Sequence, residues 1–310
     1  MRSNDVLGFV FADTLDYKIP ELAASRTTAS VPIGGKYRLI DFVLSNMSNS
    51  GVNNVGIIAK SNFMSLMDHV GSGSAYDLSK RRSNLTILTP YNGRTFSNHV
   101  ETIYNMHGYI ENSREDYVLI SPGNVVTNFD YNGLFDFHSK HNSDITLVYK
   151  RGIVPNGYER PLTIDVESDG RVSQVFVKPE NIDYEVNQVY GTILVKKDLL
   201  LEEIRRAISL NQLDAKRLIQ SILGRFRVYA YENKGYCAAI SSINDYFSFN
   251  MDLMKKEVRD ELFNQKRPIY TKVRDDAPSR YGLMSSVKNS IIAQGCVING
   301  KVENCVISKG

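Results

Sequence analysis

Residues 6–26 read VLGFVFADTLDYKIPELAASR, and their first half predicts how the chain folds. The apolar run 7–12 has the length of a buried strand. In an α/β nucleotide-binding fold, a glycine-rich turn follows the first strand, and its backbone N–H groups bind phosphate. Here the turn reads Asp13-Thr14-Leu15-Asp16, which has two carboxylates and no glycine. The stretch therefore predicts a nucleotide-type strand followed by a turn that disfavours phosphate.

The composition is that of an ordinary globular chain and excludes several classes of protein. Of 310 residues, 23% are charged and 42% are hydrophobic, which argues against disorder. The net charge of +3 is too small to indicate a nucleic-acid partner. No apolar run approaches the roughly 20 residues of a membrane span, and the N-terminus has no signal peptide. With three cysteines interpreted as reduced thiols, we expect a soluble, cytoplasmic protein without nucleic-acid or membrane partners.

From residue 6 to about residue 260, short apolar runs alternate with helical patterns. The expected strands are 7–12, 55–59, 117–121 and 145–149, and the expected helices are 38–50, 63–70, 99–110, 131–141, 198–210 and 242–260. Such alternation predicts a largely parallel sheet with helices on both faces. Residues 162–177 alternate in polarity around Asp169-Gly170, which predicts an inserted hairpin and makes the sheet mixed.

The C-terminal segment has a different pattern. VKNSIIAQG (287–295) and VENCVISKG (302–310) match at a 15-residue offset. Repeated short strands predict a parallel β-helix with stacked coils, and the alternative is one ordinary hairpin. We therefore expect an α/β domain over 1–262, a linker loop over 263–286 and, over 287–310, the first coils of a β-helix that continues beyond Gly310.

The expected linker is rich in proline and charge. Its basic residues Lys266, Arg267, Lys272 and Arg274 are candidates for binding an anionic small-molecule effector. The alternative is that they keep an exposed linker solvated.

The stretch VPIGGKYRLIDFVLSNMSNSGVNNVGI (31–57) resembles the signature of glucose-1-phosphate adenylyltransferases (ADP-glucose pyrophosphorylases). The resemblance extends to FVKP (176–179), to NMDL (250–253) and to the C-terminal repeat. It implies a Rossmann-like nucleotidyltransferase fold of the GT-A-like kind, with a mixed sheet covered by helices on both faces, and then a left-handed parallel β-helix. The activity it implies is a Mg²⁺-assisted attack of glucose 1-phosphate on the α-phosphate of ATP.

Aligned on this signature, the turn after the first strand departs from the family's Ala-Gly-Gly-x-Gly-Thr-Arg-Leu loop. Ala12 keeps its place, Asp13, Thr14 and Asp16 replace the three glycines, and Lys18 replaces the arginine. Glycine lets a backbone approach phosphates closely, whereas an aspartate adds both a side chain and a like charge. Two like charges about 5 Å apart repel by roughly 3 kcal/mol in a surface-like dielectric. We expect weak polyphosphate binding.

The resemblance also implies two metal positions. It places Asn124 and Ala239 where the family has its two Mg²⁺-binding aspartates. Mg²⁺ prefers anionic oxygen ligands, and alanine has no ligand atom. We therefore expect no intact catalytic residue and no productive Mg²⁺ binding.

Further positions follow from the same alignment. Ala12, Lys60 and Glu101 mark a vestigial nucleotide pocket, in which Lys60 replaces a glutamine that reads adenine. Lys178 and Gly191 mark the sugar-phosphate segment. Outside the resemblance, a pair of histidines three residues apart, 138 and 141, is interpreted as part of a solvated helix face.

The hypothesis that accounts for these changes is a regulatory, catalytically impaired subunit of ADP-glucose pyrophosphorylase in bacterial glycogen synthesis. It would modulate a catalytic paralogue within a hetero-oligomer, expected to be a tetramer. Two alternatives remain: an active nucleotidyltransferase with an unusual metal site, and a non-catalytic sensor of a sugar phosphate or effector. Asn124 and Ala239 distinguish the first from the second, and dependence on a partner distinguishes the first from the third.

Overall fold

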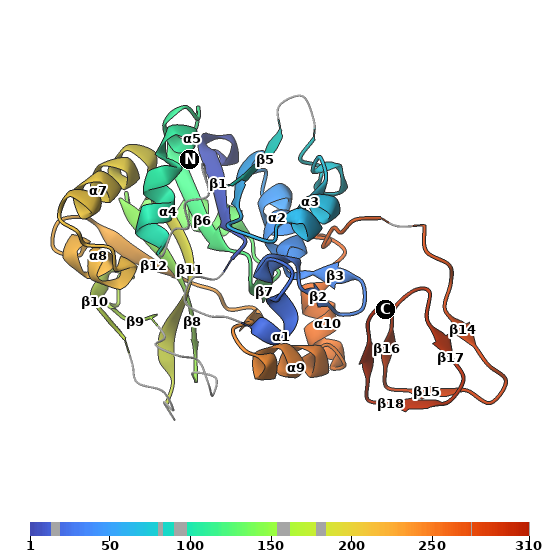
Figure 1. The fold of residues 1–310 in the computed structure, drawn as a ribbon. Coiled ribbons are helices and arrows are strands. Elements are labelled where there is room, and N and C mark those ends of the chain that lie inside the picture. Colours follow the sequence, from blue (N-terminus) through green and yellow to red (C-terminus); the bar gives the residue numbers. More distant parts are fainter. Residues whose placement is uncertain are drawn as a thin grey trace.

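The computed structural model describes residues 1–13, 19–79, 83–89, 98–153, 162–177, 184–273 and 275–309. Within these residues, nine strands form a mixed sheet through the larger part of the molecule (Figure 1). The strands are β1 (Val6–Phe11), β4 (Asn54–Ile58), β5 (Asn84–Leu88), β6 (Tyr117–Pro122), β8 (Ile145–Gly152), β9 (Leu162–Val166), β10 (Val172–Val177), β11 (Val186–Lys196) and β12 (Val228–Glu232).

The sheet combines parallel and antiparallel pairs, as the sequence predicts. Its order is β10-β9-β11-β6-β1-β4-β5, and β8 pairs with both β11 and β12. The pairs β6–β1–β4–β5 and β8–β12 are parallel, while β11 runs antiparallel to its neighbours. The hairpin expected over 162–177 is present as β9 and β10. Because β1 is buried on both faces, it is an unbroken apolar run.

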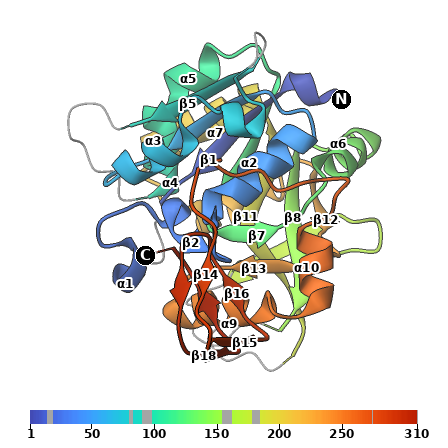
Figure 2. The same ribbon diagram turned by 90° about the vertical axis from the view of Figure 1, so that its right-hand side faces the viewer.

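Helices cover the two faces of the sheet (Figures 1 and 2). One face packs against α2 (Leu39–Asn49), α3 (Met64–Val70) and α6 (Tyr131–Lys140). The other packs against α4 (His99–Asn105), α5 (His107–Glu111), α7 (Lys197–Ser209) and α8 (Ala215–Ile222). None of the described helices combines the length and the hydrophobicity that crossing a bilayer requires.

The signature segment forms a turn and a buried helix. The short strands β2 (Pro32–Ile33) and β3 (Tyr37–Arg38) pair with each other and lead into α2. Near the start of α2, the fully buried Asp41 accepts hydrogen bonds from the Arg38 N–H (2.9 Å), from Nε2 of His69 (2.6 Å) and from the Tyr76 hydroxyl (2.5 Å). The aspartate of the signature thus ties α2 to α3 and to the 3-10 helix η3 (Ser74–Tyr76).

Two helices expected to be continuous are broken, so those predictions were wrong. Residues 99–110 form α4 and α5, because the backbone at Met106 leaves helical geometry. Residues 242–260 form parts of α9 (Ile243–Asp252) and α10 (Lys256–Leu262). At this second break, the Arg259 guanidinium donates to the carbonyl oxygens of Leu253 and Met254 (2.8 and 2.6 Å), which satisfies acceptors that the break sets free.

A third layer, below the sheet in Figure 1, is built on α1 (Pro20–Ala23), α9 and α10. This third layer covers a two-stranded sheet of β7 (Val125–Thr127) and β13 (Cys237–Ala239). The 3-10 helix η2 (Thr28–Ser30) contributes Ala29 to the core on the α2 face of the sheet. The N-terminal residues form a short 3-10 helix, η1 (Ser3–Asp5).

The first part of the expected linker packs against this body. We call residues 264–272 the strap. Asn128 Nδ2 donates to the carbonyl oxygens of Leu262 and Arg267 (2.8 and 2.9 Å), and the Tyr270 N–H donates to Ser45 Oγ (2.8 Å). The strap is therefore held by hydrogen bonds and is not a freely solvated loop.

The C-terminal segment contains β14 (Arg280–Tyr281), β15 (Ser286–Lys288), β16 (Ile291–Ile292), β17 (Val297–Ile298), β18 (Lys301–Glu303) and β19 (Val306–Ile307). The pairs β15–β18 and β16–β19 are parallel at the predicted 15-residue offset, which excludes an ordinary antiparallel hairpin. At matching corners, Asn289 and Asn304 share a left-handed backbone, and their side chains are hydrogen-bonded at 2.6 Å. Ile291 packs against the apolar cluster of the layer that contains α9 and α10, and its Cγ2 would lie 3.5 Å from a Cβ at Gly35.

Candidate functional site

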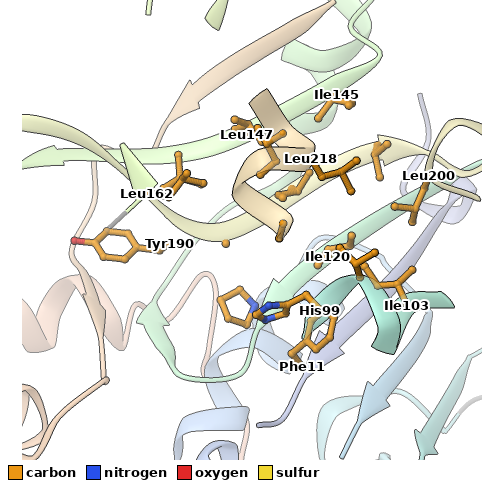
Figure 3. Close-up of a pocket in the computed structure, with 18 of the residues that line it drawn as sticks. Phe11, His99, Ile103, Ile120, Ile145, Leu147, Leu162, Tyr190, Leu200 and Leu218 are labelled. Atoms are coloured by element: carbon orange, nitrogen blue, oxygen red, sulfur yellow. The ribbon is translucent and has the colours of Figure 1, made fainter. Parts of the chain in front are cut away.

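A cavity of about 250 Å³ opens at the carboxyl ends of β1 and β6. In open α/β sheets, ligands bind at this end of the strands. Four of the positions singled out in the sequence line this one cavity: Asp13, Asn124, Gly191 and Ala239. Its interior, shown in Figure 3, is lined mainly by aliphatic side chains from the sheet and from α4, α7 and α8.

Asp13 lies at the mouth of the cavity, and its carboxylate is bound by the chain itself. Its Oδ2 accepts a hydrogen bond from the Lys60 backbone N–H at 2.7 Å. Burial raises the pKa of Asp13, against the opposing effect of backbone N–H groups of Lys60, Ser61 and Thr28 and of the Lys60 charge. Backbone donors next to the ends of β1 and β4 thus hold a carboxylate that belongs to the protein.

The remaining residues of the predicted nucleotide pocket, Ala12, Lys60 and Glu101, are not among the residues that line the cavity. Ala12 precedes Asp13 in the chain, Lys60 binds it, and Glu101 interacts electrostatically with Lys60. Ala12 is fixed by hydrogen bonds from its N–H to the Ile58 carbonyl (2.8 Å) and from the Ala29 N–H to its own carbonyl (2.9 Å). Burial lowers the pKa of Lys60, while the charges of Asp13 and Glu101 raise it. One ammonium group is therefore close to two carboxylates, and a further anion here would meet a local excess of negative charge.

The pairing of β7 with β13 brings the two predicted metal positions together. Ala239 pairs with Val125, so Asn124 is adjacent to Ile240. The Ile240 N–H donates to the Asn124 carbonyl (2.9 Å), and Asn124 Nδ2 donates to the Ile240 carbonyl (3.0 Å). The buried Asn124 amide thus extends the strand pairing. Mg²⁺ prefers carboxylate oxygens as ligands. Neither side chain fits this preference, because the Asn124 amide directs an N–H at a carbonyl and the Ala239 side chain is a methyl group.

Elsewhere in the described part of the chain, no group of three His, Cys, Asp or Glu side chains has the arrangement of a metal site.

Two glycines shape the mouth. The Gly123 N–H donates to the Phe11 carbonyl (2.8 Å), and a Cβ at this position would lie 2.8 Å from that oxygen. Gly191 has a φ of +91°, where a side chain would be strained. Close approach at Gly123 holds Asn124 near the end of β1.

Comparison with known proteins agrees with this architecture. The model of the nucleotidyl transferase family matches residues 18–256. The chain belongs to the nucleotidyl transferase family. Its mixed, parallel-rich sheet fits the Rossmann-like fold of such proteins.

Curated relatives of this chain carry two kinds of name. The chain is 30% identical over 317 residues to the glycogen biosynthesis protein GlgD of Bacillus subtilis, and the alignment covers 99% of this chain and 80% of the relative. It is 33% identical over 318 residues to GlgD of Geobacillus stearothermophilus, and this alignment covers 98% of this chain and 80% of the relative. It is also 30% identical over 321 residues to the glucose-1-phosphate adenylyltransferase of Clostridium acetobutylicum, with 100% of this chain and 83% of the relative covered.

Several predicted positions lie outside the described residues of this chain. These are Thr14, Asp16 and Lys18 in the turn after β1, Lys178 in the sugar-phosphate segment and Arg274 after the strap.

Of the basic residues considered for an effector, two already have partners within the chain. The Arg267 guanidinium contacts the Phe129 carbonyl and lies 3.7 Å from Asp130. Lys272 Nζ donates to the carbonyl and to the carboxylate of Asp68 (2.6 and 2.9 Å). These contacts anchor the strap, whereas Lys266 is exposed. The contacts of Arg267 and Lys272 compete with any anion that would bind there.

The interpretation of the two histidines on α6 was wrong for His138. This side chain is buried, its Nδ1 lies 2.8 Å from Thr146 Oγ1, and its ring makes an edge contact with Tyr117. His141 is half-buried against Phe137. Neither residue is placed in a metal site.

The helix α8, which was not predicted, lines one side of the cavity. Its apolar residues 215, 218, 219 and 222 follow helical spacing, a signal that was available in the sequence.

Proposed function

We propose that this chain is a regulatory, catalytically impaired subunit of a glucose-1-phosphate adenylyltransferase in bacterial glycogen biosynthesis. The observation that carries the proposal is the pairing of Asn124 with Ile240 beside Ala239, which leaves an amide and a methyl group at the two metal positions. The names of the relatives support the pathway, since they include both GlgD proteins and glucose-1-phosphate adenylyltransferases.

The charges at the mouth favour the same conclusion. Transfer of a nucleotidyl group requires groups that neutralise negative charge on the phosphates. At this mouth, the Asp13 carboxylate adds a negative charge and accepts a hydrogen bond from the Lys60 backbone N–H. The Lys60 ammonium also interacts electrostatically with Glu101. Loss of such charge stabilisation commonly costs several kcal/mol in the transition state, and about 1.4 kcal/mol corresponds to a tenfold change in rate.

A non-catalytic subunit changes the activity of a catalytic neighbour if it binds the neighbour's conformational states with different affinities. We propose that the parallel strand pairs of the C-terminal segment are the first coils of a left-handed β-helix, and that they contribute to a hetero-oligomer, a tetramer, with a catalytic paralogue. The limits 1–262, 263–286 and 287–310 for domain, linker and β-helix belong to this proposal, as does a cytoplasmic location.

The proposal is tested by measuring ADP-glucose formation by a catalytic paralogue alone and after mixing with this chain. We expect the two proteins to co-purify and the mixture to show a higher activity or an altered response to effectors. Unchanged kinetics at saturating concentrations of this chain would contradict the regulatory role. Binding of a sugar phosphate without any effect on the paralogue would instead support a sensor.

A further inference from the structure

The inner part of the cavity is distinct from the polar mouth. It extends between the sheet and the helices α7 and α8, over β6, β8 and β11. Leu218 of α8 projects toward Leu147 of β8, and Phe11 and His99 lie on the opposite side (Figure 3). The inner walls are aliphatic, formed by Ile120, Ile145, Val195, Leu200, Ile204 and Ile222. An empty cavity with such walls stays dry and takes up apolar molecules.

Polar groups at the two ends of the cavity are held within the chain. At the inner end, the buried Glu203 carboxylate receives two hydrogen bonds from Arg225 (2.7 and 2.8 Å). Near the mouth, the Tyr190 hydroxyl donates to Gln188 (3.1 Å), and Asn124 Nδ2 donates to the Ile240 carbonyl. A ligand therefore gains mainly from burial of apolar surface.

The charge of the cavity selects against anions. Asp13 carries a carboxylate at the mouth, and the aliphatic interior offers no compensation for burying a second negative charge. A ligand with a neutral hydroxyl group, by contrast, could donate a hydrogen bond from that hydroxyl to the carboxylate of Asp13. These features disfavour nucleotides and sugar phosphates as ligands of the inner cavity.

We propose that the inner cavity is a binding site for a small, uncharged, largely apolar molecule, a class of ligand separate from the substrates of nucleotidyl transfer. A cavity of roughly 150 Å³ accommodates benzene, so the whole cavity of about 250 Å³, mouth included, accommodates roughly ten non-hydrogen atoms. The site does not depend on the proposed regulatory function.

The test uses octan-1-ol as the neutral probe and octanoate as its anionic counterpart, titrated calorimetrically into the wild-type chain at pH 7. We expect one saturable site for octan-1-ol with a sub-millimolar dissociation constant and at least tenfold weaker binding of octanoate. Absence of saturable binding, or equal binding of the two probes, would overturn the proposal.

A cavity-filling variant locates the site. In Val195→Phe/Leu218→Trp, larger rings occupy the interior, and we expect the dissociation constant for octan-1-ol to rise at least tenfold. The matched control is Leu210→Trp, at an exposed position near α8, for which we expect no change. Equal affinity in the filled variant and the wild type would place binding elsewhere and contradict the assignment.

A second measurement serves if the double variant does not fold. The chain has no tryptophan, so Leu199→Trp, at a half-buried position of the cavity wall, introduces a unique fluorophore. We expect its emission to change saturably with octan-1-ol, while the emission of Leu210→Trp stays constant. A constant emission from the Leu199→Trp variant over the range where the wild type binds would also overturn the proposal.

Discussion

At the mouth of the cavity, the Asp13 carboxylate accepts the Lys60 N–H at the ends of β1 and β4. The Asp13→Asn change removes the charge and keeps an oxygen that can accept this hydrogen bond. We expect it to increase the affinity for ATP about tenfold or more, because one like charge near a polyphosphate costs roughly 1–3 kcal/mol. Calorimetric titration measures this, with Asp136→Asn on the exposed side of α6 as control. Tight ATP binding by the wild type would contradict this interpretation of Asp13.

Residue His138 predicts a pH dependence of stability. Burial, assisted by the Lys196 charge, lowers its pKa to about 4, whereas an unfolded histidine titrates near 6.5. The His138 imidazole therefore binds a proton more readily in the unfolded chain than in the folded chain. The stability that the neutral, buried His138 gives to the fold is present above about pH 6.5 and is lost as the pH falls toward 4. The loss in free energy of unfolding is about 1 kcal/mol at pH 5.5 and about 3 kcal/mol in full.

Urea unfolding of the wild type and of His138→Asn at pH 7.5 and pH 5.5 tests this. We expect the wild type to lose about 1 kcal/mol more than the variant between these two values. The matched variant His141→Asn should keep the wild-type dependence. Identical pH dependence in His138→Asn and the wild type would show that another group is responsible.

The sequence contains the signal for this burial. Residues 131, 134, 135 and 138 follow helical spacing, and all four are buried. His138 was assigned to a solvated face because Ser139 and Lys140 are its neighbours along the chain, although adjacent residues on a helix point in different directions.

Among the elements, the pair β7–β13 determines what Asn124 can do. Asn124→Asp replaces the N–H that faces the Ile240 carbonyl with an oxygen. We expect the free energy of unfolding to fall by about 1–3 kcal/mol, since a buried acceptor loses its donor. Denaturant unfolding measures the loss. Asn264→Asp, at an exposed position whose side-chain oxygen accepts the Lys266 N–H, should be nearly neutral. A more stable Asn124→Asp variant that also binds Mg²⁺ would contradict the structural role of Asn124.

The strap gives a second prediction for an element. Asn128→Ala removes the two hydrogen bonds to the carbonyl oxygens of Leu262 and Arg267. We expect faster amide hydrogen exchange over residues 264–270, because local opening of this segment becomes easier. Exchange followed by mass spectrometry measures it, and Asn132→Ala on the surface of α6 is the control. Unchanged exchange would show that the strap is held mainly by Ile269 and Tyr270, which pack against the body.

Elements with an unambiguous pattern were predictable, and those defined by distant contacts were not. The runs 7–12 and 117–121 lie in β1 and β6, because strands buried on both faces are apolar throughout. The segment that forms β12 is about as short as these runs, but it becomes a strand of the sheet by pairing with β8, about 80 residues earlier in the chain. The break at Met106 has no proline to mark it, and the nearby Gly108 lies inside α5.

At the scale of the whole molecule, the sequence patterns predicted the layers of the fold, and the resemblance predicted which residues to compare at the site. The structure places Asp13, Asn124, Gly191 and Ala239 around one cavity, while their roles remain predictions. The interior of this cavity was not predictable. Its volume depends on how closely Leu147 and Leu218 pack, which no local pattern encodes.

We propose that this chain, although a member of the nucleotidyl transferase family, does not catalyse efficient nucleotidyl transfer. The assay is ADP-glucose formation by the isolated chain from ATP, glucose 1-phosphate and Mg²⁺, with a catalytic glucose-1-phosphate adenylyltransferase measured in parallel. We expect a rate at least about 1,000-fold below that of the catalytic enzyme, equivalent to about 4 kcal/mol of lost transition-state stabilisation. A rate within about tenfold of that enzyme would contradict the account and support an active enzyme with an unusual metal arrangement.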